Sequence, residues 1–319
     1  MRKFWLLLTV VLGVVVAAFA GALTFGTSTP PARLGAINDA ISSRNLAGLP
    51  PAETFAARDG EKLTFRKYMG APNRAVVLVH GSTGRSESVH ELAKYLSALP
   101  QAPTLYTLDI RGHGLSGQLG DISYIGQLED DLADFLKARA AVQPSATWSL
   151  VGHSSGGGFA LRIAGSPVGS KFEKVVLLAP MLDPRGATYR PNGGGWAAPY
   201  IPRIIALRLL ESARVSLFQN LTAIAFAPRD DGTVPTYTYR LLRNFGVDEA
   251  WPGYLKAAPR APVVLVGGKD ELFVPEAFGP MMKSARADVD VTILPGLTHM
   301  DMVYHPDALQ AIARALGLR

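Results

Sequence analysis

The sequence predicts an α/β domain in which a mostly parallel, twisted sheet carries helices on both faces. Apolar runs rich in β-branched residues alternate with longer stretches of helical periodicity, which is the pattern of strands joined by crossover helices. The runs lack polar alternation, as strands do when helices cover both faces of their sheet. Of the 319 residues, 48% are hydrophobic and 18% are charged, so the chain can bury a large core.

The strands and helices of this domain can be placed from the same pattern. Six apolar runs are expected to be strands: Ala75–His80, Thr104–Ile110, Thr147–Val151, Val175–Ala179, Val263–Val266 and Val289–Leu294. The stretches with helical periodicity are Ser88–Ala98, Tyr124–Ala140, Gly158–Ala164, Pro275–Ala285 and Asp307–Leu316. A hairpin should precede them, because Thr54–Arg58 and Lys62–Tyr68 flank the turn signal Asp59-Gly60.

One interval interrupts the alternation. About 80 residues separate the strands that begin at Val175 and Val263, and a structureless loop of that length is uncommon in a compact domain. We therefore expect residues 181–260 to be a cap inserted into a core of residues 53–180 and 261–319, with helices at Ile201–Leu210 and Thr236–Phe245.

The charges of this insertion allow two interpretations. It has four more basic than acidic residues and holds the apolar side chains of Trp196, Phe245 and Trp251. These features suit an approach to an anionic bilayer. A solvated helical surface explains the same charges and is the interpretation we favour, with the bilayer as the alternative.

The N-terminus predicts a membrane segment. Arg2 and Lys3 precede an uncharged run, Phe4–Phe25, whose length of about 22 residues spans a hydrocarbon core of about 30 Å as a helix. Residues 1–26 are expected to be an uncleaved signal anchor that leaves the remainder facing the periplasm or exterior. Ala18-Phe19-Ala20 resembles a cleavage site, so a signal peptide that releases a periplasmic or secreted protein is the alternative.

A linker is expected after this segment. Residues 27–52 are rich in Pro, Gly, Ser and Ala, with one short helix expected near Ile37–Ser43.

The composition also excludes several classes of function. Cysteine is absent, which rules out disulfides and thiolate catalysis. The net charge of +6 raises the possibility of nucleic acid binding. However, no basic run stands beside interleaved aromatic residues and no nucleic-acid-binding motif is present, so we expect no nucleic acid partner. No metal, nucleotide or flavin motif is present, and no cofactor is expected.

The motif Gly152-His153-Ser154-Ser155-Gly156 carries the clearest chemical signal. It follows an apolar strand and precedes a helical stretch. A serine on such a sharp turn adopts a strained backbone, the flanking glycines relieve crowding, and its hydroxyl projects above the sheet. Ser154 is therefore the expected nucleophile. A glycine-rich loop without catalytic function is the alternative.

A serine nucleophile needs a base and an acid that orients it, which this kind of site supplies in the chain order Ser, acid, His. His299 follows the last core strand and is the expected base, whereas His305 is expected to cap the last helix. Asp270 follows the strand Val263–Val266 and is the expected acid.

Three other carboxylates lie near the ends of these strands. Asp183 follows the strand Val175–Ala179 and is the alternative. Glu271 is expected to point elsewhere than its neighbour Asp270, and Asp301 to be a solvated loop carboxylate.

Acyl transfer also needs donors for the developing oxyanion. The backbone N–H of Ser155, the residue after the nucleophile, is expected to be one donor. The second should come from the loop His80-Gly81-Ser82-Thr83-Gly84, where the N–H of Ser82 is best placed. His80 is expected only to brace this loop.

These motifs together resemble the α/β-hydrolase superfamily, in particular its lysophospholipase and monoacylglycerol-lipase-like branch. The resemblance rests on HGSTG, DIRGHGLS and GHSSGG, with KDELFVP around Asp270 and PGLTH around His299, and it extends from about residue 53 to the end except for the cap. It implies the α/β-hydrolase fold and a scaffold role for Asp109, Arg111 and His113.

The expected function is a serine hydrolase that cleaves a carboxylic ester or related acyl bond through an acyl-enzyme on Ser154. A cap of this size suits a small-molecule or lipid-like acyl substrate. The same residues could serve a peptidase, thioesterase or acyltransferase. A non-catalytic binding protein that has kept the fold is the alternative from another class.

Overall fold

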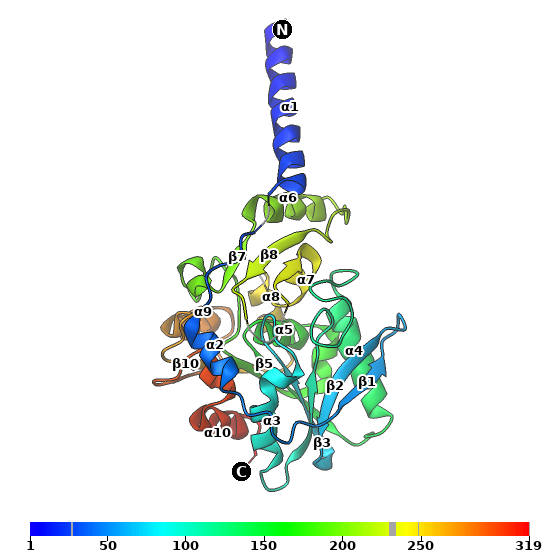
Figure 1. Cartoon of the computed structure of the whole chain (residues 1–319), viewed down its shortest axis with the longest axis vertical. Helices are drawn as coiled ribbons and strands as arrows, with labels where there is room; N and C mark the ends of the chain where they lie inside the picture. Colours follow the sequence, from blue (N-terminus) through cyan, green and yellow to red (C-terminus); the bar gives the residue numbers. More distant parts are fainter. Residues whose placement is uncertain (27, 230–233, 248, 319) are drawn as a thin grey trace.

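The computed structural model describes residues 1–26, 28–229, 234–247 and 249–318. Within them, eight strands form one sheet in the order β1-β2-β4-β3-β5-β6-β10-β11 (Figure 1). The strands are β1 Ala52–Ala56, β2 Lys62–Tyr68, β3 Ala71–Val79, β4 Pro103–Leu108, β5 Thr147–His153, β6 Phe172–Leu178, β10 Val263–Gly267 and β11 Asp290–Leu294. Every strand expected of the sheet is confirmed, with ends that differ by a few residues.

The strand directions indicate which edge of the sheet can hold a binding site. β2 is antiparallel to β1 and β4, whereas β3 to β6, β10 and β11 are all parallel. β3 lies between β4 and β5, so the chain steps to one side after β3 and to the other after β4. Open α/β sheets bind ligands at such a switch point, beyond the carboxyl ends of the strands.

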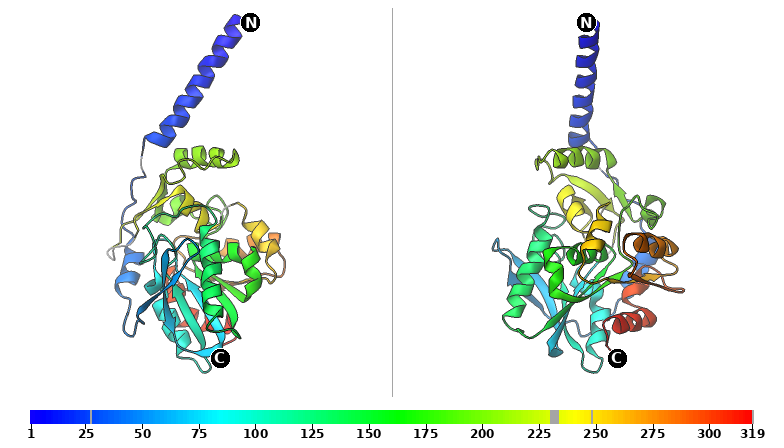
Figure 2. Two further views of the ribbon diagram at one scale, coloured as in Figure 1. Left: turned by 90° about the vertical axis from the view of Figure 1, so that its right-hand side faces the viewer. Right: turned by 180° about the vertical axis from the view of Figure 1, so that it is seen from behind.

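Helices cover both faces of this sheet (Figure 2). α3 (His90–Ser97) packs on β4 and α10 (Pro306–Ala315) packs on α3 and β10, while α5 (Ser155–Ala164) packs on β5 and β6. α4 (Gln127–Ala140) packs on β1, α8 (Trp251–Ala257) on α5, and α9 (Pro275–Ala285) on β11 and α8. The predicted fold class, an α/β-hydrolase fold, is confirmed.

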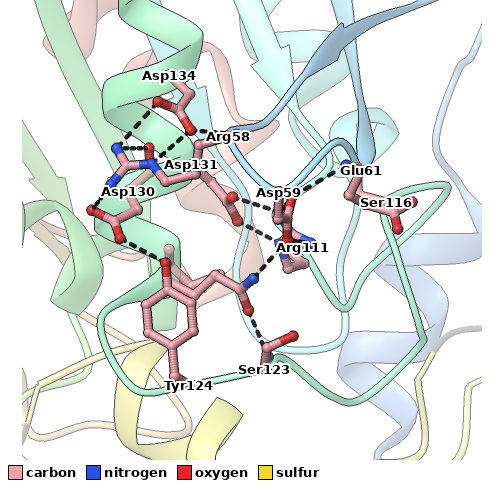
Figure 3. Close-up of polar contacts among 12 residues, drawn as sticks. Arg58, Asp59, Glu61, Arg111, Ser116, Ser123, Tyr124, Asp130, Asp131 and Asp134 are labelled. Carbon is pink, nitrogen blue, oxygen red and sulfur yellow. Dashed lines mark hydrogen bonds and ion pairs between the residues drawn. The ribbon is translucent and has the colours of Figure 1, made fainter.

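Ion pairs connect the loop after β4 to α4 and to the β1–β2 turn (Figure 3). Buried Arg111 donates to both carboxylate oxygens of Asp131 on α4, at 2.8 and 2.7 Å, and pairs with Asp59 in the β1–β2 turn at 3.0 Å. Asp109 accepts the backbone N–H of Ser86 at 2.6 Å and of Leu115 at 2.9 Å. These contacts agree with the scaffold role expected for Asp109 and Arg111.

The segment between β6 and β10, which we call the insertion, contains a second sheet that the sequence did not reveal. β7 (Ala197–Pro199), β8 (Thr222–Phe226) and β9 (Thr236–Thr238) pair antiparallel, with α6 (Ile201–Ser212) between β7 and β8 and α7 (Tyr239–Asn244) after β9. The helix expected over Thr236–Phe245 is therefore wrong in its first turn, because Thr236–Thr238 hydrogen-bond to β8.

The alternative in which three aromatic residues of the insertion approach a bilayer is contradicted. Trp196, Phe245 and Trp251 are all buried. Phe245 packs against the rings of His80 and His113, because the insertion packs directly on the α/β core and uses its large side chains for that contact.

The N-terminal helix α1 (Arg2–Thr24) projects from the body and meets the insertion at its C-terminal end (Figure 1). Leu23 is buried in a small cluster with Leu207 of α6 and Tyr239 of α7. The Phe25 carbonyl accepts the Tyr200 hydroxyl at 2.8 Å, and the Gly26 carbonyl accepts Arg203 at 2.9 Å. Residues Lys3–Thr24 are long and apolar enough to cross a membrane, with a mean hydropathy of 2.7.

The segment expected to be a linker is docked on the domain. The short helix predicted there is confirmed as α2 (Gly35–Ser42), which buries Ile37 and Ile41. Asn38 donates to the carbonyls of Leu34 at 2.9 Å and Pro228 at 3.3 Å. Because α2 is amphipathic, it buries its apolar face on the domain instead of remaining solvated; residue 27 lies outside the described residues.

Candidate active site

Ser154 stands on the turn between β5 and α5 with a strained backbone. Its φ of 56° and ψ of −119° are rare for a residue with a side chain. The flanking glycines permit this turn: a Cβ on Gly152 would lie 2.0 Å from the Gly156 carbonyl oxygen, and one on Gly156 2.3 Å from the His80 carbonyl oxygen. The turn therefore places Ser154 at the carboxyl edge of the sheet.

Asp270 and His299 lie together at the same edge. Asp270 follows β10 and His299 follows β11, and His299 Nδ1 donates to Asp270 Oδ2 at 2.8 Å. The other Asp270 oxygen accepts the backbone N–H groups of Leu272 at 2.8 Å and Phe273 at 2.9 Å. These bonds leave His299 Nε2 as the nitrogen that can take a proton.

The electrostatics of this pair favour an ionised acid and a basic imidazole. Burial raises the pKa of Asp270, but the charge and hydrogen bond of His299 and the two backbone N–H groups outweigh it and hold the pKa below its ordinary value. Burial lowers the pKa of His299, but the charge and hydrogen bond of Asp270, with the charge of Glu271, leave it raised. Each group thus stabilises the charged form of the other.

The predicted oxyanion donors are adjacent. The hydroxyls of Ser82 and Ser155 hydrogen-bond to each other, which joins the loop after β3 to the start of α5. Within the described part of the chain, neither backbone N–H has an internal hydrogen-bond acceptor. Two unpaired N–H groups beside a strained serine are a suitable arrangement for a developing oxyanion.

A small cavity of about 30 Å³ joins these groups. Ser82, Ser154 and His299 line it. Its other lining residues come from α2, the loop after β3, the insertion and the ends of the core strands: Ile37, Gly81, Gly84, Ser88, His153, Trp196, Arg229, Leu272 and Met300. Among the described residues no hydrogen bond links Ser154 to His299, and catalytic bonds of this kind often form only when substrate is bound.

Two residues that contact the oxyanion loop were not foreseen from the sequence. Tyr237 of β9 accepts the backbone N–H of Thr83 at 2.5 Å and donates to His113 Nε2 at 2.5 Å. Arg229 donates to the Thr83 hydroxyl at 2.9 Å. Thr83 itself has a φ of 59°, so the insertion holds the loop that carries Ser82 in a conformation it would not readily adopt alone.

The remaining histidines act as structural groups. His80 donates from Nδ1 to the Gly81 carbonyl at 2.8 Å and accepts the Ile110 N–H at 3.3 Å, which confirms its bracing role. Burial lowers its pKa to about 4. His153, whose pKa burial and the charge of His299 lower to about 3, donates to the His299 carbonyl at 3.1 Å. His305 caps α10 as predicted.

The other carboxylates are placed as follows. Asp183 pairs with Arg185 at 3.4 Å. Glu271 accepts the backbone N–H of His299 at 2.9 Å, so it points toward the histidine's main chain. Asp301 accepts the Thr298 N–H at 2.8 Å and is partly buried, which corrects the expectation of a solvated carboxylate, because it caps the turn that carries His299.

Residues 70–303 match the model of the family described as serine aminopeptidase, S33. The chain belongs to this S33 family. Because the match covers the core motifs and the insertion together, it supports a hydrolase built on this fold. No curated protein sequence is significantly similar to this S33 chain.

Solved structures show the same fold at low sequence identity. A protein described as an aryl esterase from Burkholderia cenocepacia is 19% identical, with a TM-score of 0.60 over 84% of this S33 chain and 100% of that chain. A membrane phospholipase A, described as a bacterial virulence factor, is 16% identical, with a TM-score of 0.57 over 99% and 98%. The Pyrococcus furiosus esterase Pf2001 is 16% identical, with a TM-score of 0.53 over 91% and 98%.

Proposed function

We propose that the protein is a serine hydrolase that cleaves the carboxylic ester of an apolar, lipid-like acyl substrate through an acyl-enzyme on Ser154. The observation that carries this proposal is the cavity that these groups share. Ser154, on its strained turn, and His299, bonded to buried Asp270, both line it. Ser82 lines it as well, so the cavity adjoins the unpaired backbone N–H groups of Ser82 and Ser155. These are the parts that acyl transfer requires.

The reaction has two steps. Ser154 Oγ attacks the acyl carbon while His299 Nε2 takes its proton, and the N–H groups of Ser82 and Ser155 hold the oxyanion. His299 then gives the proton to the leaving alkoxide as the ester bond breaks. In the second step His299 takes a proton from water, which attacks the acyl carbon. His299 then returns this proton to Ser154 Oγ as the acyl–Oγ bond breaks, which releases the carboxylic acid and free Ser154. Asp270 stabilises the imidazolium throughout and keeps its own charge.

The lining of the cavity supports an apolar acyl group. Ile37, Trp196, Leu272 and Met300 supply apolar surface around Ser154 and His299. The guanidinium of Arg229 also lines the cavity and would repel the free ammonium group that an aminopeptidase has to bind. Among the acyl bonds that this site could attack, the lining therefore favours an ester with an uncharged acyl chain.

Substrate entry requires movement around the cavity. A volume of about 30 Å³ is far below the roughly 300 Å³ or more of typical ligand pockets. Ile37 of α2 and Trp196 and Arg229 of the insertion close it from outside the core sheet. Residues 181–260 thus act as a cap on a core of residues 53–180 and 261–319, and α2 completes that cap.

The same proposal places the protein at a membrane. α1 has the length and apolarity of an uncleaved signal anchor, and Phe19 near its end packs on the insertion. The solved membrane phospholipase A covers 99% of this chain, so the likeness of fold includes the N-terminal helix. The catalytic domain would face the periplasm or exterior, opposite Arg2 and Lys3.

A panel of p-nitrophenyl esters of graded chain length tests the proposed substrate class. The full chain in detergent should hydrolyse esters with medium or long acyl chains faster than acetate. Ser154→Ala should abolish this activity, and Ser170→Ala, which removes an exposed hydroxyl bonded to the Pro167 carbonyl, should not. Hydrolysis of amino-acid p-nitroanilides with no activity on any ester would contradict the proposal and favour a peptidase.

A further inference from the structure

The outward face of α6 is apolar. Ile201, Ile205 and Leu209, spaced four residues apart and so on one side of the helix, are 52%, 56% and 59% exposed. The opposite side buries Ala206 and Leu207 within the insertion. A surface helix of a water-soluble domain normally carries charged or polar residues on its outward side, so this helix has apolar side chains on both sides.

The loop after α6 carries two more exposed apolar side chains. Leu217 and Phe218 are 65% and 51% exposed. The loop is held by backbone hydrogen bonds, from the Val215 N–H to the Leu210 carbonyl at 2.8 Å and from the Leu221 N–H to the Phe218 carbonyl at 3.0 Å. We call these five side chains the outer ridge: Ile201, Ile205, Leu209, Leu217 and Phe218. An apolar patch maintained in this way usually marks an interaction site.

The position of α1 indicates what covers the ridge. α1 contacts α6, and Leu23 shares a buried cluster with Leu207. Figures 1 and 2 show α6 as the outermost element of the body on the side from which α1 leaves, lying across the direction of α1. If α1 spans a bilayer, the surface of that bilayer lies at its C-terminal end, and α6 lies along that surface.

One exposed basic residue beside the ridge fits the same partner. Arg214 is exposed in the turn after α6, and Arg203 on the inner side of the helix donates to the Gly26 carbonyl at the end of α1. Helices that lie in a membrane interface combine apolar side chains on one face with basic residues beside them. Arg214 would thus meet the phosphates of an anionic lipid surface while the ridge enters the apolar region.

We infer that α6 and the outer ridge lie in the interface of the bilayer that α1 crosses, with the five apolar side chains among the lipids. This inference rests on the anchoring proposed above and adds a second contact to it. The anchor alone holds the domain near the membrane, whereas the ridge fixes its orientation. Trp196, which lines the cavity, lies five residues before α6, so a lipid-like substrate would enter close to the bilayer surface.

Cysteine labelling can test this contact, because the chain contains no cysteine. Ile205→Cys and Leu209→Cys would each be labelled with the fluorophore NBD and placed, as the full chain, in vesicles of phosphatidylcholine and phosphatidylglycerol with or without a spin-labelled lipid quencher. Val10→Cys in α1 is the positive control. Val142→Cys, 61% exposed after the end of α4 that lies away from the insertion, is the negative control.

The inference predicts strong quenching by the labelled lipid at Ile205→Cys, Leu209→Cys and Val10→Cys, and little at Val142→Cys. Quenching at Val10→Cys alone would overturn the ridge contact and leave the anchor standing. A blue-shifted emission at Ile205→Cys without lipid quenching would show that a second copy of the chain covers the ridge. Absence of quenching at all four positions would overturn both the ridge contact and the anchor.

Activity gives an independent readout. Ile205→Glu with Leu209→Glu should leave the rate on a water-soluble p-nitrophenyl ester unchanged, because both side chains point away from the cavity. The rate on a long-chain ester dissolved in the anionic vesicles should fall by about tenfold, since each carboxylate is repelled by the lipid charge. Val142→Glu should change neither rate. An unchanged rate of the double variant on the vesicle substrate would contradict the inference.

Discussion

Asp270 is a carboxylate with none of its surface exposed, and a buried charge of this kind persists only when its oxygens are paired. Three donors meet this requirement: His299 Nδ1 and the backbone N–H groups of Leu272 and Phe273. The bond to Nδ1 also fixes the tautomer of His299. One contact therefore both stabilises the buried carboxylate and leaves His299 Nε2 able to accept a proton.

Asp270→Asn tests this contact. An amide can present its NH₂ group to His299 Nδ1 and so favours the wrong tautomer, and we expect kcat to fall by about 10⁴-fold, as in other sites of this kind. Asp183→Asn, which alters only a pair with exposed Arg185, should change kcat little. A large loss in Asp183→Asn with near-normal Asp270→Asn would assign the acid to the loop after β6.

The raised pKa of His299 predicts the pH dependence. The imidazole must be neutral to act as base, so kcat/KM should rise with pH through a pKa above the ordinary 6.5. Glu271→Gln removes one of the charges that raise this pKa while its amide oxygen can still accept the His299 N–H. The acid limb of the pH–rate profile should therefore move to lower pH. A shift to higher pH would show that Glu271 does not act on His299 through its charge.

At the scale of elements, the insertion is joined to the catalytic domain by Tyr237. Its hydroxyl connects β9 to the oxyanion loop and to the loop after β4. Removal of this hydroxyl leaves the buried N–H of Thr83 and the Nε2 of His113 without their partner. A group left unpaired in this way costs about 1–3 kcal/mol.

Tyr237→Phe should therefore lower Tm by several degrees, and kcat on short esters should fall by about tenfold, because the N–H of Ser82 is less well positioned. Tyr200→Phe removes the hydroxyl that bonds the end of α1 and serves as a matched control that should keep full kcat. Thermal unfolding of both variants gives Tm, and steady-state kinetics give kcat. Normal kcat in Tyr237→Phe would show that the oxyanion loop holds itself.

The sequence predicted the core elements well because their signals are local. Buried strands are apolar runs, and glycines two residues before and after Ser154 indicate the sharp turn there. β7, β8 and β9 were missed because strands of three to five residues pair across tens of residues and leave little periodicity. Tyr237 lies 154 residues from Thr83, so no spacing rule could have joined them.

At the scale of the whole molecule, the apolar residues that the insertion exposes are not the aromatic ones that the sequence made prominent. The bilayer alternative involved Trp196, Phe245 and Trp251, but large aromatic side chains gain most from burial, and all three lie in the main hydrophobic core. The exposed apolar side chains are aliphatic residues of α6. Which side of a helix faces outward depends on what packs against it, and here Ala206 and Leu207 pack on Leu23 of α1, Ala223 of β8 and Tyr239 of α7.

The membrane assignment predicts the state of the mature N-terminus. An uncleaved anchor should keep Arg2 and Lys3 on the protein and hold it in membranes washed with carbonate, because the helix Lys3–Thr24 is long and apolar enough to cross a membrane. N-terminal sequencing of the purified protein, with the distribution between membrane and supernatant, gives the answer. An N-terminus at Gly21 and full recovery in the supernatant would show a cleaved signal peptide.

The central claim is that Ser154 is an activated nucleophile, and covalent labelling by a fluorophosphonate tests it most directly. The probe should bond to one serine, and mass spectrometry of the labelled peptide should place the adduct on Ser154 and not on the adjacent Ser155. Labelling should be lost in Ser154→Ala and strongly slowed in His299→Ala. An intact Ser154, with no adduct on the folded wild-type chain, would contradict the account and indicate a binding protein that has kept the hydrolase fold.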